Sequence, residues 1–140
     1  MKLFFTFSKK TLGFILSVFV VLFVVIAWYS SLKVSAIDGS THAKRMEYVR
    51  SLKLTVDEEN CSSKETVIPS DFGKVYLKYN ELQKRVGFDL SRFKGKQVTI
   101  YSYPLENTEK NLTLIVYKGE IIGGDIADIK INGEMKPLEQ

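Results

Sequence analysis

The sequence has little of the chemistry that metal and redox sites use, because it contains one cysteine, Cys61, and one histidine, His42. A single cysteine excludes an intrachain disulfide. A zinc site would need mainly carboxylates, which are not the usual ligand set. The phosphate-loop motif GxxxxGK[ST], the nucleophile motif GxSxG and the metalloprotease motif HExxH are also missing. We therefore predict no metal, no cofactor and no catalytic residue, and we expect that the protein is not an enzyme.

Acidic residues are missing from the start of the chain, where none precedes Asp38, and residues 11–32 carry no charge of either sign. A helix of about 20 apolar residues spans the ~30 Å hydrocarbon core of a bilayer. Lys2, Lys9 and Lys10 precede the segment, and the positive-inside rule places such a flank in the cytoplasm. The sequence thus predicts a cytoplasmic N-terminus over residues 1–10 and a single-pass transmembrane helix over residues 11–32, which binds the lipid bilayer.

The rest of the chain is then predicted to be extracytoplasmic, with a small polar tether over residues 33–40 and one domain over residues 41–140. About 100 residues is the size of one domain. A second reading stays open, because Val34-Ser35-Ala36 has the small-residue spacing of a signal-peptide cleavage site. Cleavage near Ala36 would release a secreted domain. The apolar run exceeds the roughly 7–15 residues of a signal peptide, which favours a retained anchor in the cell membrane.

The net charge of +4 does not indicate a nucleic-acid partner. Of the 20 basic residues, 17 follow the apolar segment together with all 16 acidic residues, so this part of the chain carries a formal charge of only +1. A phosphate-binding domain needs a concentrated basic face. The short basic turn formed by Arg92, Lys94 and Lys96 could contact anionic headgroups or wall polymers, although charge runs this short are commonly solvated turns.

Hydrophobic spacing predicts two helices in the domain. Ser40 or Thr41 is a suitable N-cap for a first helix that continues to about Lys53. A longer helix over residues 71–86 follows Ser70, and Gly87 fits the left-handed position after its end. Its predicted apolar stripe contains Phe72, Val75, Tyr76, Tyr79, Leu82 and Val86.

Alternating and β-branched runs predict strands over residues 54–56, 66–68, 97–103, 111–117 and 120–126. Lys118-Gly119 and Asn132-Gly133 are hairpin signals, and a final short strand can follow the second. Hairpin connections favour antiparallel pairing. We predict an α+β domain in which a small, mostly antiparallel sheet packs against one long and one shorter helix, as one layer of helix on one layer of sheet.

Short motifs occur in a fixed order between about Thr41 and Leu138. They are Val67-Ile68-Pro69, Val75-Tyr76, Tyr79-Asn80-Glu81-Leu82-Gln83-Lys84, Gly87-Phe88-Asp89-Leu90, Lys94-Gly95-Lys96, Tyr101-Ser102-Tyr103, Ile122-Gly123-Gly124-Asp125-Ile126 and Asn132-Gly133-Glu134-Met135. Through these motifs the chain resembles a domain-of-unknown-function family, whose members are small membrane-anchored proteins of clostridia and related Firmicutes. The resemblance implies this fold and a bacterial membrane anchor, and it brings no known activity or ligand.

Two groups of residues are candidates for a ligand or partner surface. Gly123 and Gly124 permit a bulge or a close backbone approach beside Asp125, a potential acceptor or general base. Asn80 and Gln83 present one polar edge of the long helix. Both groups also have a structural interpretation, because paired glycines bend strands and buried polar groups are nearly always bonded internally.

The leading functional hypothesis is a non-catalytic interaction or sensing domain displayed at the cell surface, where it binds a membrane or cell-wall protein. A small-ligand-binding module that uses the groove between helix and sheet is the second hypothesis. The third is a small hydrolase or transferase that uses Asp125. A ligand or enzyme site requires Asn80, Gln83 or Asp125 to line an open pocket.

Overall fold

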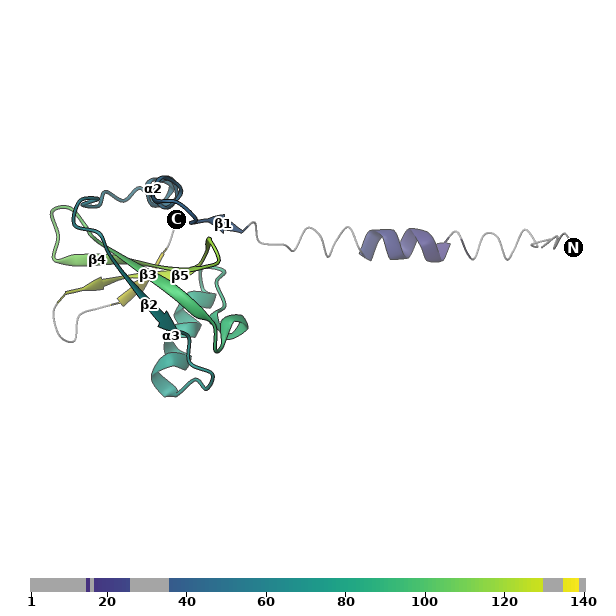
Figure 1. Cartoon of the computed structure of the whole chain (residues 1–140). Coiled ribbons are helices and arrows are strands. Elements are labelled where there is room, and N and C mark those ends of the chain that lie inside the picture. Colours follow the sequence, from purple (N-terminus) through teal and green to yellow (C-terminus); the bar gives the residue numbers. More distant parts are fainter. Residues whose placement is uncertain (1–14, 16, 26–35, 130–134, 139–140) are drawn as a thin grey trace, which may run out of the picture. The chain divides into compact units, whose positions relative to one another are not determined.

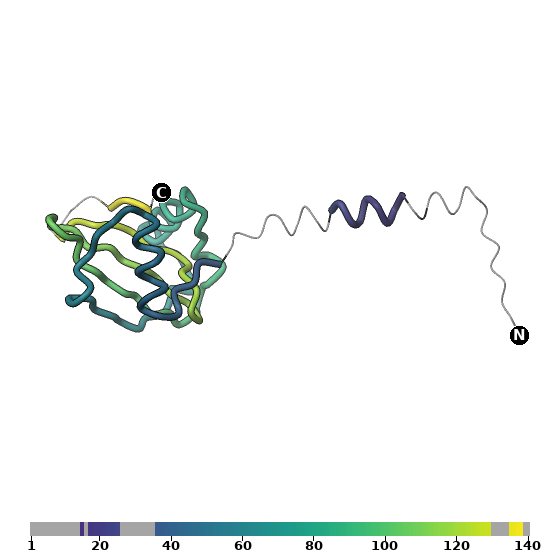
Figure 2. The backbone as a smooth tube through the Cα atoms, turned by 90° about the horizontal axis from the view of Figure 1, so that it is seen from above, coloured from purple at the N-terminus to yellow at the C-terminus, as the bar shows by residue number. Residues whose placement is uncertain are grey.

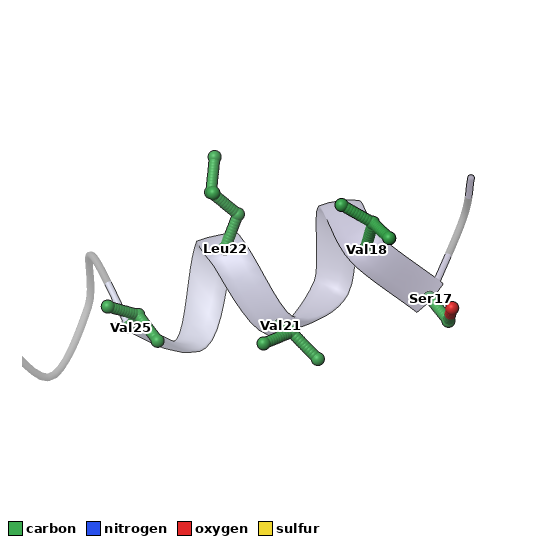
Figure 3. A pocket seen from close by; sticks show the side chains of 5 residues that line it. All are labelled: Ser17, Val18, Val21, Leu22 and Val25. Carbon is green, nitrogen blue, oxygen red and sulfur yellow. The ribbon is translucent and has the colours of Figure 1, made fainter. Parts of the chain in front are cut away.

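The computed structural model describes residues 15, 17–25, 36–129 and 135–138, and the chain divides into two compact units, Met1–Ser35 and Ala36–Gln140. In the first unit, residues 17–25 are helical, and Figure 3 shows the side chains of Val18, Val21, Leu22 and Val25 pointing away from the helix. Among the described residues, no helix is long and apolar enough to cross a membrane. Most of the predicted segment 11–32, and all of residues 1–10, lie outside the described residues.

The second unit is an α+β fold with a six-stranded sheet in which every strand pair is antiparallel. The strands lie in the order β1-β5-β4-β3-β2, and β6 also pairs with β5 (Figure 1). The predicted α+β class and the antiparallel sheet are thus confirmed. The elements are β1 (Ile37–Asp38), α2 (His42–Ser51), β2 (Ser62–Val67), α3 (Lys74–Lys84), the 3-10 helix η1 (Leu90–Phe93), β3 (Gln97–Pro104), β4 (Lys110–Tyr117), β5 (Glu120–Asp128) and β6 (Met135–Pro137).

The helices cover both faces of the sheet, which corrects the predicted single helix layer. Figures 1 and 2 show α2 on one side of the sheet and α3 on the other. Two separate hydrophobic clusters fill these interfaces. The α2 cluster includes Met46, Val49, Leu52, Tyr103, Leu112 and Leu114, and the α3 cluster is built on Ile68, Leu90, Val98, Ile115 and Ile122.

The central hairpin forms as its sequence predicts. Lys118 and Gly119 both have positive φ angles, 48° and 84°, as a two-residue type I′ turn requires. The β4–β5 register then shifts, so that Val116 faces Ile121, Ile115 faces Gly123, and Ile122 has no partner in β4. This bulge lies directly before the two glycines, and the extra residue re-aims the side chains that follow it.

Two strands begin where none is predicted. Ile37 and Asp38, expected in the tether, form β1 and pair with Ile121 and Glu120. The strand β2 begins at Ser62, although residues 57–64 read as a loop, because a polar edge strand shows no hydrophobic alternation. Conversely, residues 54–56 supply only an isolated bridge from Val56 to Leu105. The Asn132-Gly133 turn lies outside the described residues.

The long helix is shorter and rotated relative to its prediction. It begins at Lys74 after Gly73, which supplies no side-chain cap, and ends at Lys84. The N–H groups of Gly87 and Phe88 bond the carbonyls of Lys84 and Gln83, a Schellman closure around the predicted left-handed glycine. Val75 of the predicted apolar stripe is 84% exposed, whereas the polar Asn80 and Gln83 are buried. The helix therefore attaches to the sheet through polar side chains as well as apolar ones.

Candidate functional site

The residues singled out from the sequence lie where α3 meets β5 and η1. Gln83 contacts the two glycines, Asp125 lies against Tyr79, and Asn80 turns to the start of η1. We call the α3–β5 contact, formed by Tyr79, Gln83, Gly124 and Asp125, the seam.

Gln83 acts as a substitute for a missing strand. Its Nε2 donates to the Gly124 carbonyl oxygen at 2.9 Å, and its Oε1 accepts from the Gly124 N–H at 2.9 Å. On this edge of β5, β1 covers Glu120 and Ile121 and β6 covers residues 125–127, so neither strand reaches Gly124. The carboxamide presents an N–H donor beside a C=O acceptor, as a peptide group does, and it completes the hydrogen bonding of a buried backbone segment.

The two glycines permit this close approach. A Cβ on Gly123 would lie 3.0 Å from Gln83 Oε1 and 3.1 Å from Leu90 Cδ2. On Gly124 a Cβ would lie 2.3 Å from the Thr113 carbonyl oxygen and 2.7 Å from Leu138 Cδ1. Gly123 thus lets side chains from α3 and η1 approach one face of β5 closely. Gly124 lets β4 lie close beside β5 and leaves room for Leu138.

Asp125 is buried and accepts a hydrogen bond from the Tyr79 hydroxyl, with 2.7 Å between the Tyr79 oxygen and Oδ1. Burial raises the pKa of Asp125 above its ordinary value, and the bond from Tyr79 opposes that rise. The pKa of Tyr79 is raised as well, first by burial and then by the nearby carboxylate. A tyrosine held in its neutral form is a good hydrogen-bond donor and a poor proton acceptor, so the pair suits a structural contact.

Asn80 joins the helix to the next element along the chain. Its Nδ2 donates to Asp89 Oδ1 at 3.0 Å, and its Oδ1 accepts from the Leu90 N–H at 2.7 Å. Asp89 is the N-cap of η1, and its side chain also accepts hydrogen bonds from the N–H and the hydroxyl of Ser91. Asn80 thereby fixes the start of a short helix that has few bonds of its own.

The seam satisfies its polar groups internally. Within the described part of the chain, no buried side-chain nitrogen or oxygen lacks a hydrogen-bond partner, and no group of three potential metal ligands occurs. The sequence grouped Tyr79 with Tyr76, Asn80 and Gln83 and also placed it in the apolar stripe of the helix, and the structure adds the bond from its hydroxyl to Asp125. The position of Tyr79 one turn before Gln83 was the available signal. We interpret the seam as the device that docks α3 on the sheet.

A second polar cluster lies under α2 and centres on Arg45, which is 7% exposed. Its Nε donates to the Tyr103 hydroxyl and its Nη1 to the Gly39 carbonyl, both at 2.9 Å, and its guanidinium lies 3.7 Å from the Tyr101 ring centre. Burial raises the pKa of Tyr103 to about 12 despite the nearby guanidinium. Sequence spacing missed Arg45, because charged residues are rarely buried; its place beside Met46 was the only hint.

An open groove crosses one end of the sheet, at the ends of β2 and β4 and the start of β3. Glu65, Lys96, Tyr117 and Lys118 contribute to its lining. The structure thus adds Lys118, from the β4–β5 turn, to the basic turn predicted around Lys94 and Lys96. Glu65 is the acidic member, and its carboxylate accepts a hydrogen bond from Gln97 across the strands at 2.9 Å.

Comparisons with known proteins place the chain in a family without assigning chemistry to either cluster or to the groove. No curated protein and no solved structure matches the chain significantly. One family model, described as a domain of unknown function (DUF4830), matches residues 49–126, a span that includes α3, η1 and most of β5. Because the match covers more than half of the chain, the protein belongs to this domain-of-unknown-function family, as its sequence motifs predict.

Proposed function

We propose that the protein is a single-pass membrane protein that holds an interaction or sensing domain against the outer side of the cytoplasmic membrane. The observation that carries the proposal is the short distance along the chain between the chargeless segment and the sheet. The segment ends at Leu32 and β1 begins at Ile37. The four intervening residues reach at most about 14 Å when extended.

The hydrogen bonds within the seam favour a binding role for the surface of the domain, in preference to a buried ligand site. Gln83 is fully buried, Asn80 is nearly so, and both amide groups bond to backbone or side-chain partners. Asp125 is buried and accepts a hydrogen bond from Tyr79. A ligand could reach these groups only after α3 had left the sheet. The anchor would instead raise the effective concentration of the domain for partners in the same membrane or in the adjacent wall.

The topology is tested first, with reporters fused to the C-terminus. A reporter active only outside the cytoplasm should work, and one active only inside should not. The opposite pattern overturns the proposal. A C-terminal tag recovered in the medium, on a chain that starts near Ile37, would instead favour cleavage near Ala36.

The interaction role is tested by photo-crosslinking in native membranes. A crosslinker at Val75, which is 84% exposed on α3, samples the surface of the domain. The matched control carries the crosslinker at Val49, a residue of α2 that is buried against the sheet. A membrane or wall protein captured from position 75 and not from position 49 supports the proposal. Recovery of the protein alone from both positions counts against it.

A further inference from the structure

The strand β2 forms one edge of the sheet. All six of its residues pair with β3, and no other strand in the described part of the chain pairs with it. Five of its six side chains are exposed, and they include the apolar side chain of Val67, which is 56% exposed. An open edge of this kind carries a row of backbone donors and acceptors with which another strand can pair.

The register of β3 shows which backbone groups of β2 are open. At the β3–β4 turn the Leu105 N–H donates to the Lys110 carbonyl oxygen at 2.9 Å. Because bonded residues alternate along an antiparallel ladder, the odd-numbered residues of β3 bond to β4 and its even-numbered residues bond to β2. The Ile68 N–H follows the same alternation, since it donates to the Lys96 carbonyl oxygen at 3.0 Å.

Three residues of β2 therefore direct their backbone groups away from the sheet. The even-numbered residues of β2 lie opposite the even-numbered residues of β3 and bond to them. The N–H and carbonyl groups of Ser63, Glu65 and Val67 point outward. No hydrogen bond to these outward backbone groups occurs among the residues that the structure describes.

Two neighbouring charges of opposite sign mark this edge. Lys64 and Glu65 are both exposed, and their side chains point to opposite faces of the sheet. Lys64 forms no salt bridge with any described residue, and the Glu65 carboxylate accepts one hydrogen bond, from the neutral Gln97. A strand added to this edge places one residue opposite each charge. The edge therefore favours a strand with an acidic residue opposite Lys64 and a basic residue opposite Glu65.

The same charges disfavour a second copy of this chain as the added strand. In a two-fold antiparallel pair, outward-facing residues must meet outward-facing residues, so the axis passes through one residue of β2. An axis through Lys64 or Glu65 puts like charges directly opposite one another, which is destabilising. An axis nearer either end leaves at least half of the six residues unpaired. Charged edge residues are a common protection against such self-pairing.

We propose that the open edge of β2 is the docking site for an extended segment of a different protein, which adds to the sheet as an antiparallel strand. The segment carries a basic residue opposite Glu65, an acidic residue opposite Lys64 and an apolar residue that covers Val67. Backbone hydrogen bonds supply the affinity, and the two charges supply the specificity. The inference rests on the interaction role proposed above, to which it adds the chemistry of the partner, and it does not use the anchor.

The test uses two synthetic peptides with the full chain in detergent micelles. In acetyl-Val-Thr-Lys-Glu-Thr-Thr-amide, antiparallel pairing places the lysine opposite Glu65 and the glutamate opposite Lys64, and the second peptide exchanges these two residues. At ten times its dissociation constant, the first peptide should slow hydrogen exchange at the Ser63, Glu65 and Val67 amides about tenfold. The second peptide should bind about tenfold more weakly. Equal binding of the two peptides, or binding of neither, overturns the proposal.

A charge-exchanged chain tests the specificity. Lys64→Glu/Glu65→Lys keeps the net charge and changes only exposed positions. This variant should prefer the second peptide over the first by about tenfold, because both cross-strand charge pairs are then restored with that peptide. A preference that stays with the first peptide contradicts pairing along this edge.

A proline at the edge tests the backbone bonds. Glu65→Pro removes one outward N–H, and proline is tolerated in an edge strand where the N–H faces solvent. The matched control Glu65→Thr removes the same carboxylate and keeps the N–H. The first peptide should protect the Val67 amide in Glu65→Thr alone, and protection in both variants or in neither contradicts strand addition. Slow exchange at the Lys64 amide, which faces β3, verifies that β2 stays paired in both variants. If β2 opens in Glu65→Pro, the charge-exchanged chain decides.

The outcome is separable from that of the proposed function. If the peptides do not bind but a membrane or wall protein is still captured from position 75, strand addition alone is overturned. If the first peptide binds but no membrane or wall protein is captured, either from position 75 or from a crosslinker at Ser63, the interaction role is overturned. The strand addition that rests on that role then falls with it.

Discussion

The two faces of the sheet hold their helices by different proportions of apolar and polar contact. On one face, Met46 and Val49 of α2 enter an apolar cluster, and one buried polar residue, Arg45, adds bonds to Tyr103 and Gly39. On the other face, the fully buried residue of α3 is Gln83, whose carboxamide bonds to the backbone of Gly124. Apolar burial depends on area and tolerates reshaping, whereas a buried amide requires both of its partners in place. The α3 face should therefore be the more sensitive to single-atom changes.

The largest expected effect comes from adding a methyl group at Gly124. A Cβ there meets the Thr113 carbonyl oxygen at 2.3 Å, so the backbone of β4 or β5 must shift, and Gly124→Ala should lose about 3 kcal/mol of unfolding free energy. Gly123→Ala is the comparison and should lose less, because its Cβ would lie 3.0 Å from Gln83 Oε1 and 3.1 Å from Leu90 Cδ2, side-chain atoms that need to shift by only a few tenths of an ångström. Urea unfolding measures both. Equal losses would show that the two glycines matter only as flexible residues.

The next effect tests the carboxamide itself. Gln83→Leu keeps the volume and leaves the N–H and carbonyl of Gly124 buried without partners, so it should cost about 2–3 kcal/mol. Val75→Ala on the same helix, at an 84% exposed position, should change stability by less than about 0.5 kcal/mol. Hydrogen exchange at the Gly124 amide should accelerate in Gln83→Leu alone. An unchanged exchange rate would contradict the interpretation that the Gln83 side chain replaces the hydrogen bonds of a strand at Gly124.

This contrast also explains which parts of the structure could be predicted from the sequence. The strands β3, β4 and β5 and the Lys118-Gly119 turn follow from β-branched residues and turn chemistry, which are local properties. The burial of Gln83 depends on the gap between β1 and β6 along the edge of β5 that β4 does not cover. No spacing rule for a helix contains that information.

The candidate residues follow the same division. Sequence reasoning selected Gly123, Gly124 and Asp125 because two glycines in a strand permit a bulge or a close backbone approach beside a carboxylate. It could not show that the Tyr79 hydroxyl would donate a hydrogen bond to the Asp125 carboxylate, because the two residues are 46 positions apart in the chain. Arg45 was missed for a related reason, since its partners Tyr101, Tyr103 and Gly39 come from β3 and the loop after β1.

The pH dependence of stability separates a buried carboxylate from an exposed one. The pKa of Asp125 is raised by burial in the folded state, so the folded protein holds this proton more tightly than the unfolded chain does. Its contribution to stability is fully present below about pH 4 and is lost as the pH rises through the raised value. The unfolding free energy of Asp125→Asn, minus that of the native protein, should therefore increase from about pH 4 upward.

Glu58 provides the control of opposite sign. The hydrogen bond from His42 holds the pKa of this exposed carboxyl below its usual range. Its contribution is present above about pH 4 and is lost as the pH falls, so Glu58→Gln should cost stability at neutral pH and nothing in acid. Urea unfolding across this pH range measures both variants. Slopes of the same sign would contradict the assignment of Asp125 to a desolvated site.

The smallest expected effect concerns how the two helices begin. Thr41 caps α2, and its Oγ1 accepts from the Lys44 N–H at 3.2 Å, whereas α3 begins after Gly73 without a side-chain cap. Thr41→Ala should cost about 1 kcal/mol. Ser70→Ala, at the position from which sequence spacing predicts a cap for α3, should cost less than about 0.5 kcal/mol. If Ser70→Ala lost as much unfolding free energy as Thr41→Ala, α3 would begin earlier in solution than at Lys74. Its first turn would then stabilise the docking of α3 on the sheet in addition to the bonds of Gln83.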